Sequence, residues 1–135
     1  MHGEHRDREP IPAVVNDVGT AVLKAAFSVH DSLGPGLLES VYEHCLIEEL
    51  QSAGLSAARQ VGVPVSYRDA RLDVGFRIDV LVERSVVVEI KAIDALASIH
   101  SAQVLTYLRF SGVRLGYLVN FNSVRLKDGI RRLVL

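Results

Sequence analysis

The chain of 135 residues lacks several features that mark particular classes of protein. It holds one cysteine, Cys45, so no disulfide can form within it, and we expect a reducing, cytoplasmic environment. No apolar stretch approaches the roughly 20 residues that span a bilayer, and the first ten residues lack the apolar core of a signal peptide. We therefore expect a protein that is neither secreted nor inserted into a membrane.

A surplus of basic residues is also missing. The chain has 15 Lys and Arg against 16 Asp and Glu, which gives a net charge of −1. Proteins dedicated to nucleic acids usually carry excess positive charge, which releases counterions from the phosphate backbone. Nucleic-acid binding by this chain would have to use a local patch of basic residues, be weak, or need a partner.

The order of apolar patterns favours one α/β domain. Residues 1–12 are polar, contain Pro10 and Pro12, and are predicted to be a disordered tail, leaving 13–135 as the folded part. Apolar residues that recur at three- and four-residue steps predict helices, and apolar residues that alternate with polar ones predict strands. The predicted helices are 16–33, 37–53 and 96–110. The predicted strands are 60–67, 73–82, 86–91, 114–120 and 130–135. This order, α-α-β-β-β-α-β-β, favours a mixed sheet flanked by helices. Pro64 cannot donate to a ladder, so its strand should lie at an edge or contain a bulge.

The hairpin formed by strands 73–82 and 86–91 carries the most informative residues. Side chains alternate between the two faces of a strand, so one face of the first strand is predicted to be apolar and the other to carry Asp79. The residues of the apolar face are Phe76, Ile78, Val80 and Val82. A turn over 83–85 would set Asp79 directly across from Glu89, and also Arg77 across from Lys91. Opposed carboxylates repel each other. A divalent cation such as Mg²⁺ or Mn²⁺ would compensate, since it prefers carboxylate oxygens.

Structural explanations for the same residues stay open. Acidic residues and Glu-X-Lys pairs also occur on wet strand faces, where the charges simply pair. Glu39, in the first turn of helix 37–53, could complement exposed helix N–H groups instead of completing a cation site. If the acids do cluster, repulsion should raise the pKa of at least one of them, and replacing Asp79 should cost little stability.

A further group of residues is predicted to contact a substrate. His100, Gln103 and Tyr107 follow one another at three and four residues on helix 96–110, and Gln103 interrupts an apolar stretch. Its amide should therefore meet something polar. Arg77 and Tyr42 complete this group, although a tyrosine in the position of Tyr42 is more often a packing residue whose hydroxyl finds a partner.

Several segments together resemble a known family. They are Gly36-Leu37-Leu38-Glu39-Ser40-Val41-Tyr42, Phe76-Arg77-Ile78-Asp79, Val88-Glu89-Ile90-Lys91, Ala102-Gln103-Val104-Leu105-Thr106-Tyr107-Leu108 and Asn120-Phe121-Asn122. The chain resembles the GxxExxY family, placed in the PD-(D/E)XK nuclease superfamily. One departure is Ser101, where the family pattern has an acidic residue.

The resemblance implies a fold, a metal site and a chemistry. The implied core is helix, three strands, helix, strand. Asp79 and Glu89 look like the two motif carboxylates, Lys91 like the motif lysine, and Glu39 like the helix carboxylate that completes the metal site. By the same resemblance, Gln103 is similar to the polar residue on the helix that follows.

Two functions follow from these observations. The first is a nuclease that uses Mg²⁺ or Mn²⁺ to hydrolyse DNA or RNA, with the catalytic residues Lys91, Glu89, Asp79 and Glu39. The alternative is a catalytically silent binding or assembly module with a nuclease fold, which could form a homo-oligomer. Open, converging carboxylates would favour the enzyme, whereas carboxylates plugged by a Lys or Arg would favour the module.

Overall fold

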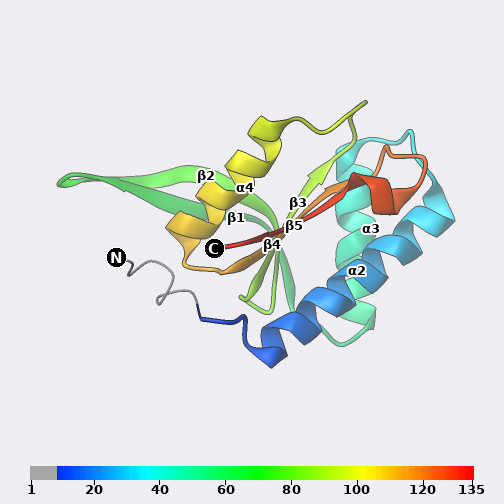
Figure 1. Cartoon of the computed structure of the whole chain (residues 1–135), viewed down its shortest axis with the longest axis horizontal. Helices are drawn as coiled ribbons and strands as arrows, with labels where there is room; N and C mark the ends of the chain where they lie inside the picture. Colours follow the sequence, from blue (N-terminus) through cyan, green and yellow to red (C-terminus); the bar gives the residue numbers. More distant parts are fainter. Residues whose placement is uncertain (1–8) are drawn as a thin grey trace.

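A computed structural model describes residues 9–135 as a five-stranded sheet with helices packed on it (Figure 1). The elements, in chain order, are α2 (Ala13–Leu33), α3 (Glu39–Ser52), β1 (Ala57–Tyr67), β2 (Ala70–Val82), β3 (Val86–Lys91), α4 (Ser98–Ser111), β4 (Leu115–Asn120), the 3₁₀ turn η1 (Leu126–Gly129) and β5 (Ile130–Val134). The predicted disorder of residues 1–8 lies outside the described residues. Residues 9–12 carry no helix or strand, and the guanidinium of Arg114 donates hydrogen bonds to the carbonyls of Glu9 and Pro10.

The sheet is mixed, which confirms the predicted α/β class. Its strands lie in the order β1-β2-β3-β4-β5, with β3 and β4 parallel and the other neighbours antiparallel. Helix α4 makes the crossover between β3 and β4, the connection that a parallel pair requires. Both β3 and β4 are buried along nearly their whole length, as expected for strands covered on both faces.

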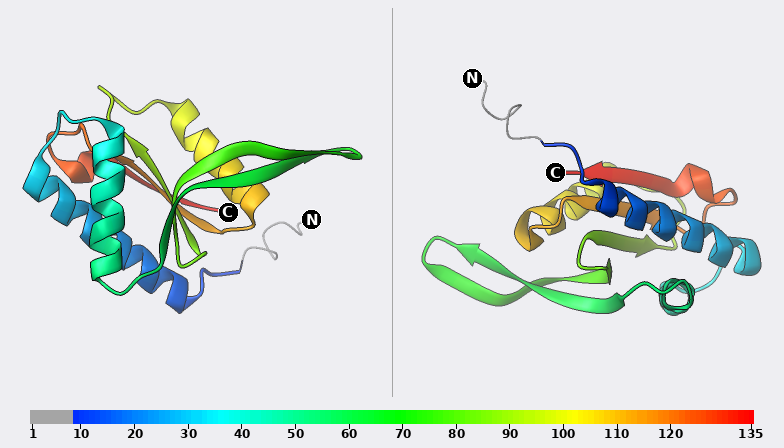
Figure 2. Two further views of the ribbon diagram at one scale, coloured as in Figure 1. Left: turned by 180° about the vertical axis from the view of Figure 1, so that it is seen from behind. Right: turned by 90° about the horizontal axis from the view of Figure 1, so that it is seen from below.

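Two apolar clusters lie on opposite faces of this sheet. Helices α2 and α3 pack together and bury one cluster, which includes Val22, Leu46 and Val88. Helix α4 buries the other, which includes Val87, Val104 and Leu118. Figures 1 and 2 show the α2–α3 pair well separated from α4. Within residues 9–135, no helix is long and apolar enough to cross a membrane.

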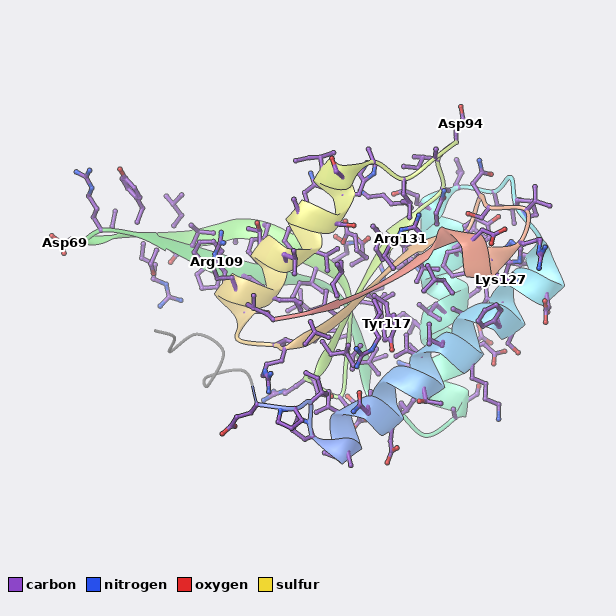
Figure 3. The ribbon with its side chains drawn as sticks, in the orientation of Figure 1. Asp69, Asp94, Arg109, Tyr117, Lys127 and Arg131 are labelled. Carbon is purple, nitrogen blue, oxygen red and sulfur yellow. The ribbon has the colours of Figure 1, made fainter. Side chains whose placement is uncertain are left out.

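Strands β1 and β2 continue past the core as a projecting hairpin, which we call the arm (residues 64–75; Figure 1). Asp69 lies at its tip (Figure 3). The prediction for Pro64 is confirmed on both counts, because β1 is an edge strand and its register shifts between Val63 and Val65. Strand β2 begins at Ala70, earlier than predicted, because residues 70–75 are exposed on both faces and therefore show no burial alternation.

Candidate active site where strand β3 leaves β2

The β2–β3 ladder has the predicted register but is short. Val82 pairs with Val86 and Val80 with Val88, and the ladder ends there. Asp79 and Glu89 thus lie one position beyond the last pair, on adjacent antiparallel strands. The predicted pairing of Arg77 with Lys91 is wrong: the β2–β3 ladder has already ended, and Arg77 is exposed and pairs only with Gly62 on β1.

The Asp79 carboxylate holds the strands together where the ladder ends. Its Oδ2 accepts the backbone N–H of Ile90 at 2.9 Å, so a side chain satisfies a donor on β3 that would otherwise lack a β2 partner. Its Oδ1 accepts a hydrogen bond of 3.3 Å from the amide nitrogen of Gln60 on β1. Both carboxylate oxygens therefore have one protein donor each, and each keeps acceptor capacity for another ligand.

The predicted apolar face of β2 is wrong at this point. Val80 and Val82 belong to the α2–α3 cluster, whereas Phe76 and Ile78 belong to the α4 cluster. The change of face falls at Asp79, opposite Gln60 on β1. Gln60 has a left-handed backbone with φ of 53°, and the change of face on β2 coincides with it.

Glu89 is a buried carboxylate that lacks a full set of partners. It projects on the α4 side of the sheet, opposite to Val88 and Ile90, and is 6% exposed. Its Oε2 lies 3.5 Å from the Nζ of Lys91. Its Oε1 is buried and has no hydrogen-bond partner among the residues that the structure describes.

The surroundings of Glu89 raise its pKa from an ordinary 4.5 to about 8. Burial contributes most, because the charged form loses its hydration, and repulsion by Asp79 adds to it. The ammonium of Lys91 acts in the opposite direction and lowers the pKa of Glu89. The raised pKa of Glu89 agrees in direction with the expectation, but burial outweighs the repulsion that was predicted as its cause, and Glu39 is not among the groups that shift it.

Tyr107, from the α4 side, lies near both carboxylates. Burial raises the pKa of its hydroxyl, and the charges of Glu89 and Asp79 raise it further. Its ring stacks on Phe76 with 4.3 Å between centroids, which fixes the side chain. Gln103 is half-buried one turn earlier on α4, and its side-chain amide has no hydrogen-bond partner within residues 9–135.

His100 and Tyr42, two other predicted substrate contacts, have structural partners. The Nδ1 of His100 accepts the backbone N–H of Ala97 at 2.8 Å, at the N-terminus of α4. Tyr42 is fully buried, donates to the Gly34 carbonyl at 2.6 Å and accepts the N–H of Leu37 at 3.1 Å. Tyr42 therefore presents no surface to a substrate; it shapes the loop that precedes Glu39.

Glu39 lies on the opposite side of the sheet from Glu89. It begins α3, as predicted, and its Oε2 accepts the N–H of Ala92 at 3.3 Å, next to Lys91 in the chain. A hollow of about 230 Å³ opens here, lined by Glu39, Ser40, Glu43, Gln60, Asp79 and Ile90. Within residues 9–135, no three His, Cys, Asp or Glu side chains are grouped closely enough to hold a metal. The structure thus brings Asp79 and Glu89 together and leaves Glu39 apart from Glu89.

Two residues of this hollow were missed from the sequence. Glu43 is 6% exposed, and its carboxylate accepts hydrogen bonds from Gln60 at 2.7 Å and Arg59 at 3.2 Å. Its position one helical turn after Glu39 was a usable signal. Gln60 gave no such signal, because a left-handed backbone at a non-glycine residue leaves no mark in the sequence.

A family model described as the PD-(D/E)XK nuclease superfamily matches residues 16–133. The matched range contains every residue of the site described above. No curated protein matches the chain, and no solved structure does. The narrower resemblance to the GxxExxY family remains a prediction from the sequence.

Proposed function

Since the chain belongs to the PD-(D/E)XK nuclease superfamily, we propose that it is a divalent-metal-dependent phosphodiesterase that hydrolyses DNA or RNA. The observation that carries this proposal is the burial of the Glu89 carboxylate next to a second carboxylate. This carboxylate is 6% exposed, close to Asp79 and without a hydrogen-bond partner at Oε1 among the described residues, and its pKa is raised to about 8 even with Lys91 beside it. Its charged form therefore needs more positive charge than Lys91 supplies.

A divalent cation fits the donors that are present. Mg²⁺ and Mn²⁺ prefer carboxylate oxygens, and the free acceptor capacity at Asp79 and Glu89 is of that kind. We propose that these two residues would hold the cation; Glu39, predicted as a third ligand, lies on the other side of the sheet and is not placed among the ligands. When bound, the cation would stabilise negative charge on the phosphate and promote ionisation of a water.

Lys91 is proposed to act on the reacting groups. Its ammonium, 3.5 Å from Glu89, carries three donors and no acceptor while protonated. It can therefore hold a water or a phosphate oxygen beside the carboxylates and stabilise negative charge that develops there. Gln103 and Tyr107 are retained as proposed substrate contacts from α4, and Arg77 as one from β2.

The distribution of charge supports a polyanionic substrate despite the net charge of −1. Residues 13–53, which contain α2 and α3, hold one basic and six acidic side chains. Residues 54–135, which contain the sheet and α4, hold twelve basic and seven acidic ones. Because α2 and α3 cover only one face, the negative charge is concentrated away from the α4 side, where Glu89 and Lys91 project. Repulsion of a nucleic acid is therefore weakest on that side.

One observation favours the alternative of a silent binding module. The ammonium of Lys91 lies next to the Glu89 carboxylate, and its positive charge partly neutralises that carboxylate without a metal ion. In that case the ion pair would be purely structural, and the fold could serve assembly, including homo-oligomers, in the cytoplasm. Nothing in this second proposal requires divalent ions.

A cleavage assay separates the two proposals. Labelled single-stranded DNA, duplex DNA and RNA are incubated with the protein in Mg²⁺, in Mn²⁺ and in chelator. We expect cleavage of at least one substrate only with a divalent ion, and its loss in Lys91→Ala. Asp69→Asn, at the tip of the arm, is the matched surface control and should cleave normally. No cleavage by the wild type, together with a large loss of stability in Lys91→Ala, would leave the binding module as the better account.

A further inference from the structure

Gln60 stands out as a residue whose backbone is held in an unfavourable conformation beside the candidate site. Its φ of 53° is in the left-handed region, which a non-glycine residue seldom occupies. Such strain persists where the surroundings fix it, and it is often found at functional sites. Here the surroundings are two carboxylates: Glu43 Oε1 at 2.7 Å and Asp79 Oδ1 at 3.3 Å from the Gln60 amide nitrogen.

We propose that Gln60 is a positioning residue that orients the Asp79 carboxylate toward the bound cation. This inference rests on the proposed function, because it assigns a role relative to the cation that Asp79 would hold. Gln60 itself is not placed among the ligands of the cation. Its role is to fix the orientation of Asp79, which is a proposed ligand.

The hydrogen bonds explain how the orientation is set. An amide nitrogen has two hydrogens, and here each is directed at a different carboxylate. Glu43 cannot swing away freely, because it is buried and also accepts from Arg59 at 3.2 Å. Asp79 is in turn held at its second oxygen by the Ile90 N–H. The rotation of the Asp79 carboxylate is thus fixed from both sides, and its remaining lone pairs have defined directions.

The neutral charge of Gln60 is as important as its reach. Glu43 and Asp79 both line the same hollow, and a shared neutral donor lets both accept a hydrogen bond without adding charge beyond that of Arg59. Partners that orient a metal ligand in this way typically contribute about 10- to 100-fold to metal affinity. The left-handed backbone occurs at the residue whose side-chain amide reaches both carboxylates.

A purely structural role of Gln60 predicts different behaviour from a positioning role. Gln60 would then only tie α3 to β1, and any residue that relieved the strained backbone would preserve the site. Gly accepts a left-handed backbone at no steric cost. Gln60→Gly therefore separates the two roles, because it relieves the strain and removes the amide at once.

Two measurements on the full chain test the proposal. The first, in chelator, is the NMR chemical shift and hydrogen exchange of the Ile90 amide, which reports directly on its bond to Asp79. The second is the Kd for Mn²⁺ by calorimetry. In both Gln60→Ala and Gln60→Gly we expect an upfield shift and faster exchange at Ile90, with a Kd raised by about tenfold or more. Gln51→Ala, on the exposed surface of α3, is the matched control and should change neither.

The outcomes distinguish the inference from the function on which it rests. If the wild type binds Mn²⁺ and both Gln60 variants bind it equally, with an unchanged Ile90 amide, the positioning role is overturned while the cation site stands. If Gln60→Gly alone retains the wild-type affinity, the role is structural and the inference fails. If the wild type binds no Mn²⁺, the cation site itself is overturned, and the role of Gln60 toward it falls as well.

Discussion

The carboxylate of Asp79 accepts the backbone N–H of Ile90 at 2.9 Å, one position beyond the last backbone pair of β2 and β3. A side chain that was predicted only to bind metal therefore also closes the hairpin. This bond changes the expectation that replacing Asp79 would cost little stability. Its loss leaves a donor on β3 without a partner, and an unsatisfied buried group is costly.

We accordingly predict that Asp79→Ala lowers the free energy of unfolding by about 1–3 kcal/mol in chelator. Asp79→Asn should cost less, because its amide oxygen can still accept the Ile90 N–H although its charge is gone. Urea denaturation of the two variants and the wild type measures the difference. Equal stability of all three proteins would show that the Ile90 bond contributes nothing.

The raised pKa of Glu89 predicts a pH-dependent stability. Between about pH 4.5 and 8, the folded chain keeps a proton on Glu89 that the unfolded chain has lost. The free energy of unfolding should therefore fall as pH rises through this window, by on the order of a few kcal/mol in the absence of metal. Glu89→Gln stays neutral and should remove this part of the pH dependence. Urea denaturation in chelator from about pH 5 to pH 8 tests it, and parallel curves for the two proteins would contradict it.

Lys91→Ala should separate chemistry from metal binding. The carboxylates hold the cation, whereas a protonated lysine has no lone pair to offer it. We expect divalent-dependent cleavage to be lost while Mn²⁺ is still bound. Removing the ammonium also removes a charge that lowers the pKa of Glu89, so without metal the carboxyl should stay protonated to higher pH. A variant that loses metal binding and cleavage together would place Lys91 in the structure of the site and not in its chemistry.

Tyr42→Phe should reduce stability without altering the chemistry directly. The stacking on Phe121, with centroids 4.6 Å apart, would remain. The hydrogen bonds to Gly34 and Leu37 would be lost, which leaves two backbone groups short of a partner. We expect a loss of about 1–3 kcal/mol in the free energy of unfolding. Tyr67→Phe on the exposed arm is the matched control and should be close to neutral. A neutral Tyr42→Phe would show that the loop does not depend on this hydroxyl.

Much of the fold could be read from the sequence because its signals are local. The apolar period of α2, the run of β-branched residues in β3 and the effect of Pro64 on the edge strand each depend on a few neighbouring residues. The turn over 83–85 was equally local, and it correctly set Val82 opposite Val86. Those local signals were sufficient to bring Asp79 and Glu89 to adjacent strands.

The details of the site could not be predicted in the same way, because they depend on the point at which the regular alternation of the strands stops. The reading of β2 assumed strict alternation, so it put Ile78 and Val80 on one face and missed the switch at Asp79. The switch lies opposite Gln60, whose left-handed backbone is on another strand and more than fifteen residues away in sequence. Glu43 was visible as a neighbour of Glu39 on the helix, but its bond to Gln60 follows only from the tertiary structure.

The central claim is that Asp79 and Glu89 share one divalent cation, and calorimetric titration with Mn²⁺ tests it most directly. The wild type, at about pH 8, should bind close to one ion per chain and release protons, since Glu89 must ionise to bind. At about pH 8, Glu89→Gln and Asp79→Asn should bind at least tenfold more weakly than the wild type, and Asp69→Asn should match it. The affinity of the wild type should weaken toward about pH 6, where Glu89 is protonated, and its advantage over Glu89→Gln should shrink. If the wild type gives no heat of binding, or if Glu89→Gln binds Mn²⁺ as tightly as the wild type, the claim is wrong.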